Sequence, residues 1–527
     1  MASLFSAVAH VGGSTLVSRL LGFARDFVIA RVFGADAETD AFFVAFKVPN
    51  LMRRLFGEGA FALALVPVLA EYRRAGDTGA LRRLIDDLAG TLAAVLLVVT
   101  AIGLVAAPGL VLLLAPGYVD EPEQRALTAD LLRLTLPYIW FIGLAALAGG
   151  VLNTHHRFAV PAFTPVLLNL LLIGCALWLA PRLDAPITAL AIAVLVGGMV
   201  QLGFQLPFLA RLRCLPRPRL GFSSPGVRRI GRAMLPTLFG VSVAQLGLLI
   251  DTFLASFLTT GSISWLYYAE RLTELPLGVL GVAFGTVILP RLTGAHLGRS
   301  SADFSATLDW ALRWVLLLGL PASAGLIILA GPTMATLFWS ERFGAHDVAM
   351  AAQGLAAYTL GLVAFMAIKV LAPGYFGRQE QGTPVRIAAL ALAVNLVLSL
   401  ILMWPLAHVG LALGTALAAV VNAVLLLYGL WRDDVYRPGP GWPRLLLQVG
   451  VATLLMCGGI SVGVGSTADW LGMTTAGRAL RLVGLIGLGL ASYALVLALL
   501  GLRPRSLMAP APSDDVEPRP APGPPII

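Results

Sequence analysis

The chain is dominated by apolar runs that are about as long as a lipid bilayer is thick. Hydrophobic residues make up 58% of its 527 residues and charged residues only 12%, whereas about a quarter of an ordinary soluble domain is charged. Runs of roughly 20 residues suit α-helices crossing a hydrocarbon core and are too long for the strands of a membrane barrel. The sequence therefore predicts an all-α polytopic membrane protein.

Windows of this length predict about fourteen transmembrane helices. They are Val8–Phe33, Asp40–Ala70, Leu88–Leu114, Leu131–Leu152, Val160–Ala180, Ile187–Leu209, Leu235–Leu258, Trp265–Leu289, Val315–Phe338, Val348–Leu371, Pro384–Leu406, Val409–Leu430, Leu445–Val464 and Leu480–Leu500. We expect the second span to be interrupted at Pro49 and at residues 57–59.

Loop charge predicts the orientation of these spans. Arginines gather in alternate connections, most densely in 211–232, while the opposite connections carry mainly Asp and Glu. Cytoplasmic loops are enriched in Lys and Arg, so both termini should be cytoplasmic. The net charge of +9 thus reflects loop placement and attraction to membrane lipids, not nucleic-acid binding. Residues 1–17 have no basic start or cleavage site typical of a signal peptide.

Weak internal matches suggest a duplication. Asp26 and the four residues after it match the segment from Asp251, and Thr164–Val166 resembles Thr383–Val385. Such matches keep their order at a nearly constant offset, which predicts two six-helix lobes in a parallel pseudo-repeat plus two C-terminal helices. The predicted boundaries are 1–211, 212–432 and 433–502, followed by a disordered cytoplasmic tail, 503–527, rich in Pro and Ala.

Two short stretches combine apolar and charged residues at helical spacing. Leu81, Leu84, Ile85 and Leu88 alternate with charged neighbours, and 303–313 repeats the arrangement. We expect interfacial amphipathic helices before the third and ninth spans.

Ionisable residues inside the predicted spans are the strongest functional signal. Ser18, Arg25 and the neighbouring Arg19 and Asp26 follow one helical stripe of the first span, and Arg53 and Arg271 lie in the second and eighth. Each charge costs about 2.5–3.5 kcal/mol at a helix centre on insertion scales, so these side chains should face a polar cavity. Arginine also presents a planar donor fork suited to phosphate.

A structural alternative stays open at this point. Arg25–Asp26, Asp40–Lys47 and Arg271–Glu274 can each form an internal ion pair that holds helices together. Other chemistry is not indicated: the three cysteines are far apart, and no phosphate-binding loop, nucleophile elbow or zinc-protease motif is present. The sequence predicts a protein that is not an enzyme.

Two motif blocks resemble a known family. Arg25–Asp26 with AFFVAFKVPNLMRRLFGEGAF (41–61), and YYAERLTELPLGVLGVA (267–283), are similar to the MurJ (MviN) family of bacterial lipid II flippases in the MOP transporter superfamily. The resemblance covers nearly all of 1–502. It implies two six-helix lobes, two C-terminal helices forming a groove for a lipid tail, and a location in the bacterial inner membrane.

The resemblance also implies site residues. The cationic cavity positions of the family match Arg19, Arg25, Arg53 and Arg271, and further polar positions match Ser18, Asp26, Asp40, Lys47, Asn50, Ser264 and Glu274. Some members bind sodium at positions that match Asp251, Asn395 and Thr415, but an acidic position of that site is Ser399 here. A coupling sodium ion or proton is the only cofactor that the resemblance suggests.

The function implied is transport of lipid II, an undecaprenyl-diphosphate-linked disaccharide-pentapeptide, from the inner to the outer leaflet by alternating access, for cell-wall peptidoglycan. Cell-wall synthesis proteins are possible partners. Two alternatives stay open: an exporter of another oligosaccharide-lipid or small molecule in the same superfamily, and a non-transporting membrane scaffold.

Overall fold

The computed structural model describes residues 2–57, 60–297 and 301–502, and the regular secondary structure of these residues is helical throughout. The chain divides into two compact units. Unit 1 holds 1–268, 337–351 and 403–411, and unit 2 holds 269–336, 352–402 and 412–527. The predicted tail 503–527 and Glu58 lie outside the described residues.

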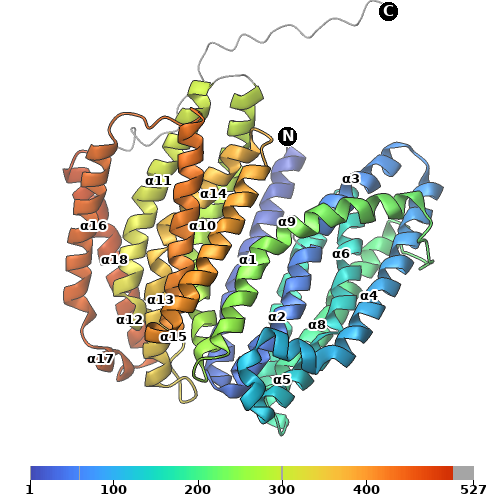
Figure 1. Ribbon diagram of the computed structural model, residues 1–527, viewed down its shortest axis with the longest axis horizontal. Coiled ribbons are helices and arrows are strands. Elements are labelled where there is room, and N and C mark those ends of the chain that lie inside the picture. Colours follow the sequence, from blue (N-terminus) through green and yellow to red (C-terminus); the bar gives the residue numbers. More distant parts are fainter. Residues whose placement is uncertain (1, 58–59, 298–300, 503–527) are drawn as a thin grey trace, which may run out of the picture. The chain divides into compact units, whose positions relative to one another are not determined.

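Unit 1 contains the N-terminal helices (Figure 1). They are α1 (Ala2–Phe33), α2 (Ala37–Gly57), α3 (Ala60–Arg74), α4 (Thr78–Leu114), α5 (Pro122–Thr135), α6 (Tyr138–Thr154), α7 (Ala159–Gly174), α8 (Thr188–Arg211), α9 (Pro225–Ala255) and the first residues of α10 (Ser262–Leu297). Within it α1 packs against α7, α6 against α8, and α2 against α5 and α6.

Unit 2 contains the remainder of α10 and the later helices, except for residues 337–351 and 403–411, which belong to unit 1. They are α11 (Ser301–Ile328), α12 (Ala330–Leu337), α13 (Ala345–Leu360), α14 (Leu362–Phe376), α15 (Gly382–Arg432), α16 (Trp442–Val464), α17 (Thr467–Leu471) and α18 (Thr475–Leu499). Here α11 packs against α14 and α16, and α16 packs against α18.

The all-α membrane architecture is confirmed. Eight helices of the described part are long and apolar enough to cross a bilayer, or nine if the bent pair α13–α14 is one span. The predicted count of fourteen stays a prediction. The predicted boundary between the eleventh and twelfth spans is visible inside α15, where Ala407 has a non-helical φ of 48° and ψ of −132°.

Two local predictions were wrong. Helix α2 runs unbroken through Pro49 and ends at Gly57. The stretch around Leu81 is not a separate interfacial helix but the first turns of α4, which begins after Asp77, whose side chain accepts a hydrogen bond from Ala80 N at 2.8 Å.

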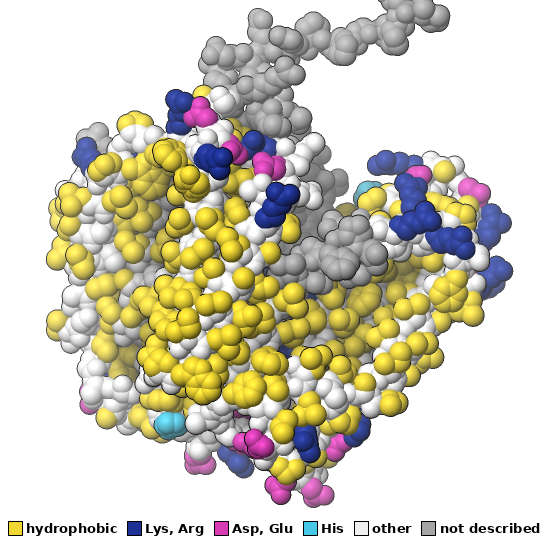
Figure 2. Space-filling model, viewed as in Figure 1, with side chains coloured by type: hydrophobic (Ala, Val, Ile, Leu, Met, Phe, Trp, Pro, Cys, Tyr) yellow, Lys and Arg dark blue, Asp and Glu magenta, His cyan; other side chains and the backbone are white. Residues whose placement is uncertain are grey.

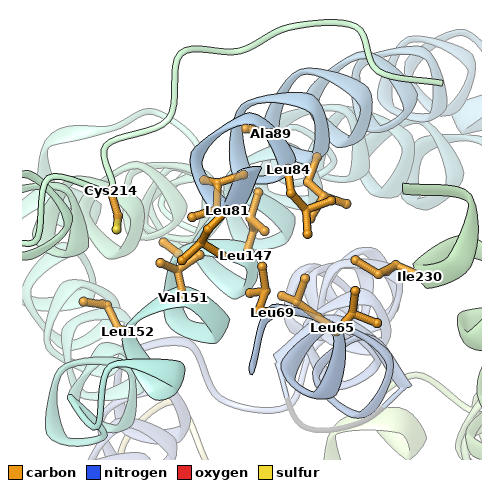
Figure 3. Packing of buried hydrophobic residues seen from close by; sticks show 14 of the residues in the cluster. Leu65, Leu69, Leu81, Leu84, Ala89, Leu147, Val151, Leu152, Cys214 and Ile230 are labelled. Carbon is orange, nitrogen blue, oxygen red and sulfur yellow. The ribbon is translucent and has the colours of Figure 1, made fainter. Parts of the chain in front are cut away.

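The apolar stripe of these first turns is buried in protein, not lipid. Leu81, Leu84, Ile85 and Leu88 join a cluster with residues of α3 and α6, among them Leu65 and Val151 (Figure 3). Phe304, Leu308 and Leu312 of the second predicted amphipathic stretch are likewise buried, at the start of α11. The sequence pattern of an apolar stripe at helical spacing does not depend on whether lipid or another helix covers the stripe.

Candidate functional site: a polar network on α1, α2 and α10

Arg25 lies at the centre of a buried polar network in unit 1. Its Nε and Nη2 donate to Asp26 Oδ1 at 2.9 and 2.6 Å. Nη1 donates to Asn169 Oδ1 of α7 at 3.1 Å. Only 8% of Arg25 and 2% of Asp26 is exposed, so the charged pair is withdrawn from solvent and lipid, as expected for ions that would be costly there.

Tyr267, at the start of α10, closes this network. Its hydroxyl accepts a hydrogen bond from Arg25 Nη2 at 3.1 Å and donates one to Asp26 Oδ1 at 2.9 Å. Its ring stacks on Phe43 of α2, with centroids 4.0 Å apart. Asn169 also donates from Nδ2 to the carbonyl oxygen of Ser18 at 3.3 Å. The network therefore ties α1 to α7 and to α10 through one guanidinium.

Asp40 forms a second node within unit 1. Its Oδ2 accepts from Gly261 N at 2.7 Å, and its Oδ1 accepts from both the Ser264 amide, at 2.8 Å, and the Ser264 hydroxyl, at 2.5 Å. Asp40 is 2% exposed and Ser264 is fully buried. The carboxylate thus caps the beginning of α10, where helix amide groups have no partner within the helix.

The other predicted residues of unit 1 lie on more open surfaces. Arg53 donates from Nε and Nη2 to Asn50 Oδ1, one turn earlier on α2, at 3.2 and 3.1 Å. Lys47 and Ser18 are half-buried, and Arg19 is exposed. Asp251, near the end of α9, is half-buried.

Unit 2 holds the remaining predicted residues. Arg271 Nη1 pairs with Glu274 Oε2 at 2.8 Å across one turn of α10, with 27% and 44% of the two side chains exposed. In α15, Asn395 Oδ1 accepts from the Ser399 hydroxyl at 3.1 Å and the Thr415 hydroxyl at 3.3 Å. Neutral oxygens of this type can coordinate a sodium ion, but none of these three belongs to a carboxylate.

The structure shows several pairs of predicted residues in contact, while the larger predicted sites stay predictions. Arg25–Asp26 and Arg271–Glu274 are ion pairs, which is the structural alternative stated above, and Asp40 meets Ser264. Convergence of Arg25 and Arg53 with Arg271 of unit 2 stays a prediction, as does a sodium site joining Asp251 to the α15 cluster.

Sequence reasoning missed two residues of the network. Tyr267 belongs to the second motif block, and the sequence does not show that its hydroxyl bridges both charges. Asn169 stands alone among leucines in the fifth predicted span. A single amide within an apolar helix is a usable signal, because amide side chains hydrogen-bond across helices in membranes.

Comparisons with known proteins decide the family. A family model described as "Lipid II flippase MurJ" matches residues 29–478. The chain belongs to the MurJ family. A probable lipid II flippase MurJ of Vibrio cholerae is 46% identical over 506 residues, covering 95% of this chain and 96% of that protein. The lipid II flippase MurJ of Burkholderia cenocepacia is 43% identical, covering 89% of this chain and 92% of that protein.

Solved structures agree on the fold of this MurJ-family chain. A structure titled "Lipid II flippase MurJ, inward closed conformation" matches with a TM-score of 0.79 and 24% identity, covering 93% of this chain and 98% of that one. An inward-facing MATE-family transporter of the MOP superfamily matches with a TM-score of 0.65 and 18% identity, over 79% and 95% of the two chains. The chain is therefore a multi-span inner-membrane protein of a transporter family, not an enzyme.

Proposed function

We propose that this chain moves lipid II from the inner to the outer leaflet of the cytoplasmic membrane by alternating access. The observation that carries the proposal is the near-complete match to MurJ proteins, 46% identical over 95% of the chain in one case. The lobes would rock around the substrate head group, as in transporters built from repeats. Both termini lie in the cytoplasm in this proposal.

Arg25 is the residue that we assign to the diphosphate. Its guanidinium lies in the first predicted span and has a planar donor fork that suits phosphate oxygens. In the present structure the fork is engaged by Asp26, Asn169 and Tyr267. A diphosphate that enters must therefore compete with a carboxylate for the same donors, and Asp26 becomes the group that reclaims Arg25 after release.

The polar cluster in α15 bears on what drives transport. The acidic position of the family's sodium site is Ser399 here, and the hydroxyls of Ser399 and Thr415 both donate to Asn395 Oδ1. We therefore propose that the membrane potential, not a sodium gradient, contributes the drive. Moving one charge through 100 mV is worth about 2.3 kcal/mol. Flipping that continues when potassium replaces sodium, and stops when the potential is dissipated, is the expected result.

The decisive experiment is rescue of a flippase-depleted bacterium by this chain alone. Accessibility of lipid II at the outer leaflet is the readout. The intact chain should restore it, and Arg25→Ala should not, while both proteins reach the membrane in equal amount. The matched control is Arg133→Gln, an exposed arginine paired with Asp130 on α5, which should rescue fully.

The outcomes separate the alternatives. Failure of the intact chain to expose lipid II would overturn the function and favour an exporter of another lipid-linked sugar or small molecule, or a scaffold. Rescue by the intact chain and by Arg25→Ala alike would keep the function and overturn the role of Arg25.

A further inference from the structure

The connection between α8 and α9, residues Leu212–Ser224, carries an unusual combination of exposed side chains. Leu220, Phe222 and Leu215 are 71%, 54% and 50% exposed. Arg213, Arg217 and Arg219 lie among them and are also exposed. Large apolar side chains beside several arginines on an open surface are typical of segments that lie in the interface of a membrane.

This α8–α9 segment is held firmly in place although it has no regular helix or strand. Arg217 N donates to Asp86 Oδ1 at 2.7 Å, and Arg219 N donates to Asp86 O at 3.0 Å. Gly221 N donates to the Thr91 hydroxyl at 3.0 Å. The segment therefore follows α4 for more than one turn, through backbone bonds that leave its side chains turned to the surroundings.

Two glycines make this close approach possible. A Cβ atom at Gly90 of α4 would lie 2.2 Å from the Arg219 carbonyl oxygen, and one at Gly221 would lie 2.3 Å from Asp87 Cβ. Such distances are far below van der Waals contact, so the backbone of the segment can lie against α4 only because both positions lack a side chain.

The lipid-facing surface of α4 fixes the depth of the segment. Exposed apolar residues extend from Val95 to Leu113 on this helix. At 1.5 Å per residue that band is about 27 Å long, close to the roughly 30 Å of a bilayer's hydrocarbon core. Thr91, where Gly221 is bonded, lies four residues before the band, about 6 Å from its edge. The segment therefore lies at the level of the lipid head groups.

Charge complementarity decides which surface it meets. Residues 211–232 contain seven arginines and no Asp or Glu, and all seven are exposed. Figure 2 shows basic side chains gathered at this end of α3 and α4, next to the apolar surface of the helices. A soluble acidic partner would explain the arginines but not Leu220 and Phe222 at the edge of the lipid-facing band.

We propose that the α8–α9 segment is a membrane anchor, in which Leu220 and Phe222 insert into the head-group boundary while Arg213, Arg217 and Arg219 bind anionic phospholipid. The partner is the anionic surface of the bilayer that the chain itself spans. The anchor holds the connection between α8 and α9 at a fixed depth.

Spin labelling of the full-length chain tests the insertion. Cysteines 175, 214 and 457 are replaced, and a nitroxide is attached at Phe222→Cys or, as the matched control, at Ala75→Cys in the exposed turn after α3. The protein is reconstituted into phosphatidylcholine vesicles with increasing phosphatidylglycerol. The label at 222 should become accessible to oxygen and protected from a water-soluble nickel chelate, while the label at 75 stays accessible to nickel. Equal nickel accessibility at both positions, at every lipid composition, would overturn the proposal.

The arginine contribution is tested in the same vesicles with the label at 222. Each arginine near an anionic surface contributes about 1 kcal/mol, or about fivefold. Arg213→Gln/Arg217→Gln/Arg219→Gln should therefore raise the phosphatidylglycerol fraction needed for half-maximal protection at least fivefold, because the bonds to α4 run through the backbone. Arg125→Gln/Arg133→Gln, on α5, should leave it unchanged.

Two results would contradict the role of the arginines. One is an unchanged midpoint in the triple variant. The other is equal protection of the label in pure phosphatidylcholine vesicles on addition of inorganic phosphate, which would mean a site for a free anion and not a membrane surface.

Discussion

Asp40 offers the sharpest test of how the start of α10 is held. Its two oxygens accept three hydrogen bonds, from Gly261 N, Ser264 N and the Ser264 hydroxyl, in a site where Asp40 is 2% exposed. Hydrogen bonds to a charged group contribute about 1.5–3 kcal/mol each, and a buried donor left without a partner costs about 1–3 kcal/mol.

The bonds give a ranked series of variants. Ser264→Ala removes one donor of three and should lower the free energy of unfolding by about 1.5–3 kcal/mol. Asp40→Ala removes the acceptor from two backbone amides and a hydroxyl, and should lower it by about 3–9 kcal/mol, at about 1–3 kcal/mol for each donor left without a partner. The loss in Asp40→Asn should lie between these two values. The asparagine keeps one acceptor oxygen, but its NH2 group then faces a protein donor.

The assay is equilibrium unfolding of the purified protein in a mild detergent, with helicity measured by circular dichroism as the signal. In a double-mutant cycle, Ser264→Ala should cost much less in the Asp40→Ala background than in the wild type. Ser262→Ala is the control, because Ser262 is also fully buried but its hydroxyl is 3.5 Å from that of Thr259. Additive effects of the Asp40 and Ser264 variants, or an equal loss in Ser262→Ala, would refute the capping role.

Three further variants test other contacts. Tyr267→Phe keeps the ring but removes the hydroxyl that bridges the Arg25–Asp26 pair; we expect the free energy of unfolding to fall by about 1–3 kcal/mol, and unchanged stability in the same assay would refute the bridge. Gly90→Ala places a methyl group against the segment after α8 and should expose it to limited proteolysis, whereas Gly109→Ala, which has open space around it, should not. Arg229 donates a hydrogen bond to Glu71 and attracts it by charge, which lowers the pKa of Glu71 below its ordinary value; the pair's stabilisation is therefore present above the ordinary carboxyl pKa and is lost as the pH falls through the lowered pKa. The difference in melting temperature between the wild type and Glu71→Gln should disappear in acid, and a difference that grows in acid would contradict the assignment.

The sequence predicted the membrane class and the local pairs well, because these depend on composition and short spacing. Arg25 and Asp26 are adjacent in the chain, and Arg271 and Glu274 are one helical turn apart. The second pair meets because side chains three residues apart are neighbours on a helix surface, whatever surrounds them.

Contacts between distant residues were beyond this reasoning. Asp40 and Ser264 are separated by 224 residues, and only the family resemblance singled out both. Asn169 and Tyr267 are neutral, whereas the ion-pair hypothesis for Arg25 includes only charged partners. In a membrane interior, neutral amide and hydroxyl groups also satisfy an ion pair, and their positions depend on which helices pack together.

The wrong prediction at Leu81 has a related cause. The apolar stripe was recognised correctly, but its cover is a set of residues from α3 and α6, not lipid. Periodicity reports which face of a helix avoids water and says nothing about what that face meets. The predicted interruption at Pro49 was wrong for another reason. A proline removes only one backbone donor, and helix α2 continues through it, as membrane helices commonly do.

The Arg25 network affects how tightly the diphosphate is bound and how fast it is released in the proposed cycle. Asp26 is 2% exposed, and its Oδ1 accepts from both Arg25 and Tyr267. If a diphosphate takes Arg25, the buried Arg25–Asp26 ion pair is broken, and breaking such a pair costs about 3–5 kcal/mol. Tyr267 can still donate to Asp26, so the carboxylate keeps this hydrogen bond. The remaining cost weakens substrate binding at this position and thereby speeds release, since the Arg25–Asp26 pair re-forms as the diphosphate leaves. Asp26→Asn should then bind the diphosphate more tightly and release it more slowly than the wild type, whereas weaker binding would show that Asp26 orients Arg25 for the substrate and does not compete with it.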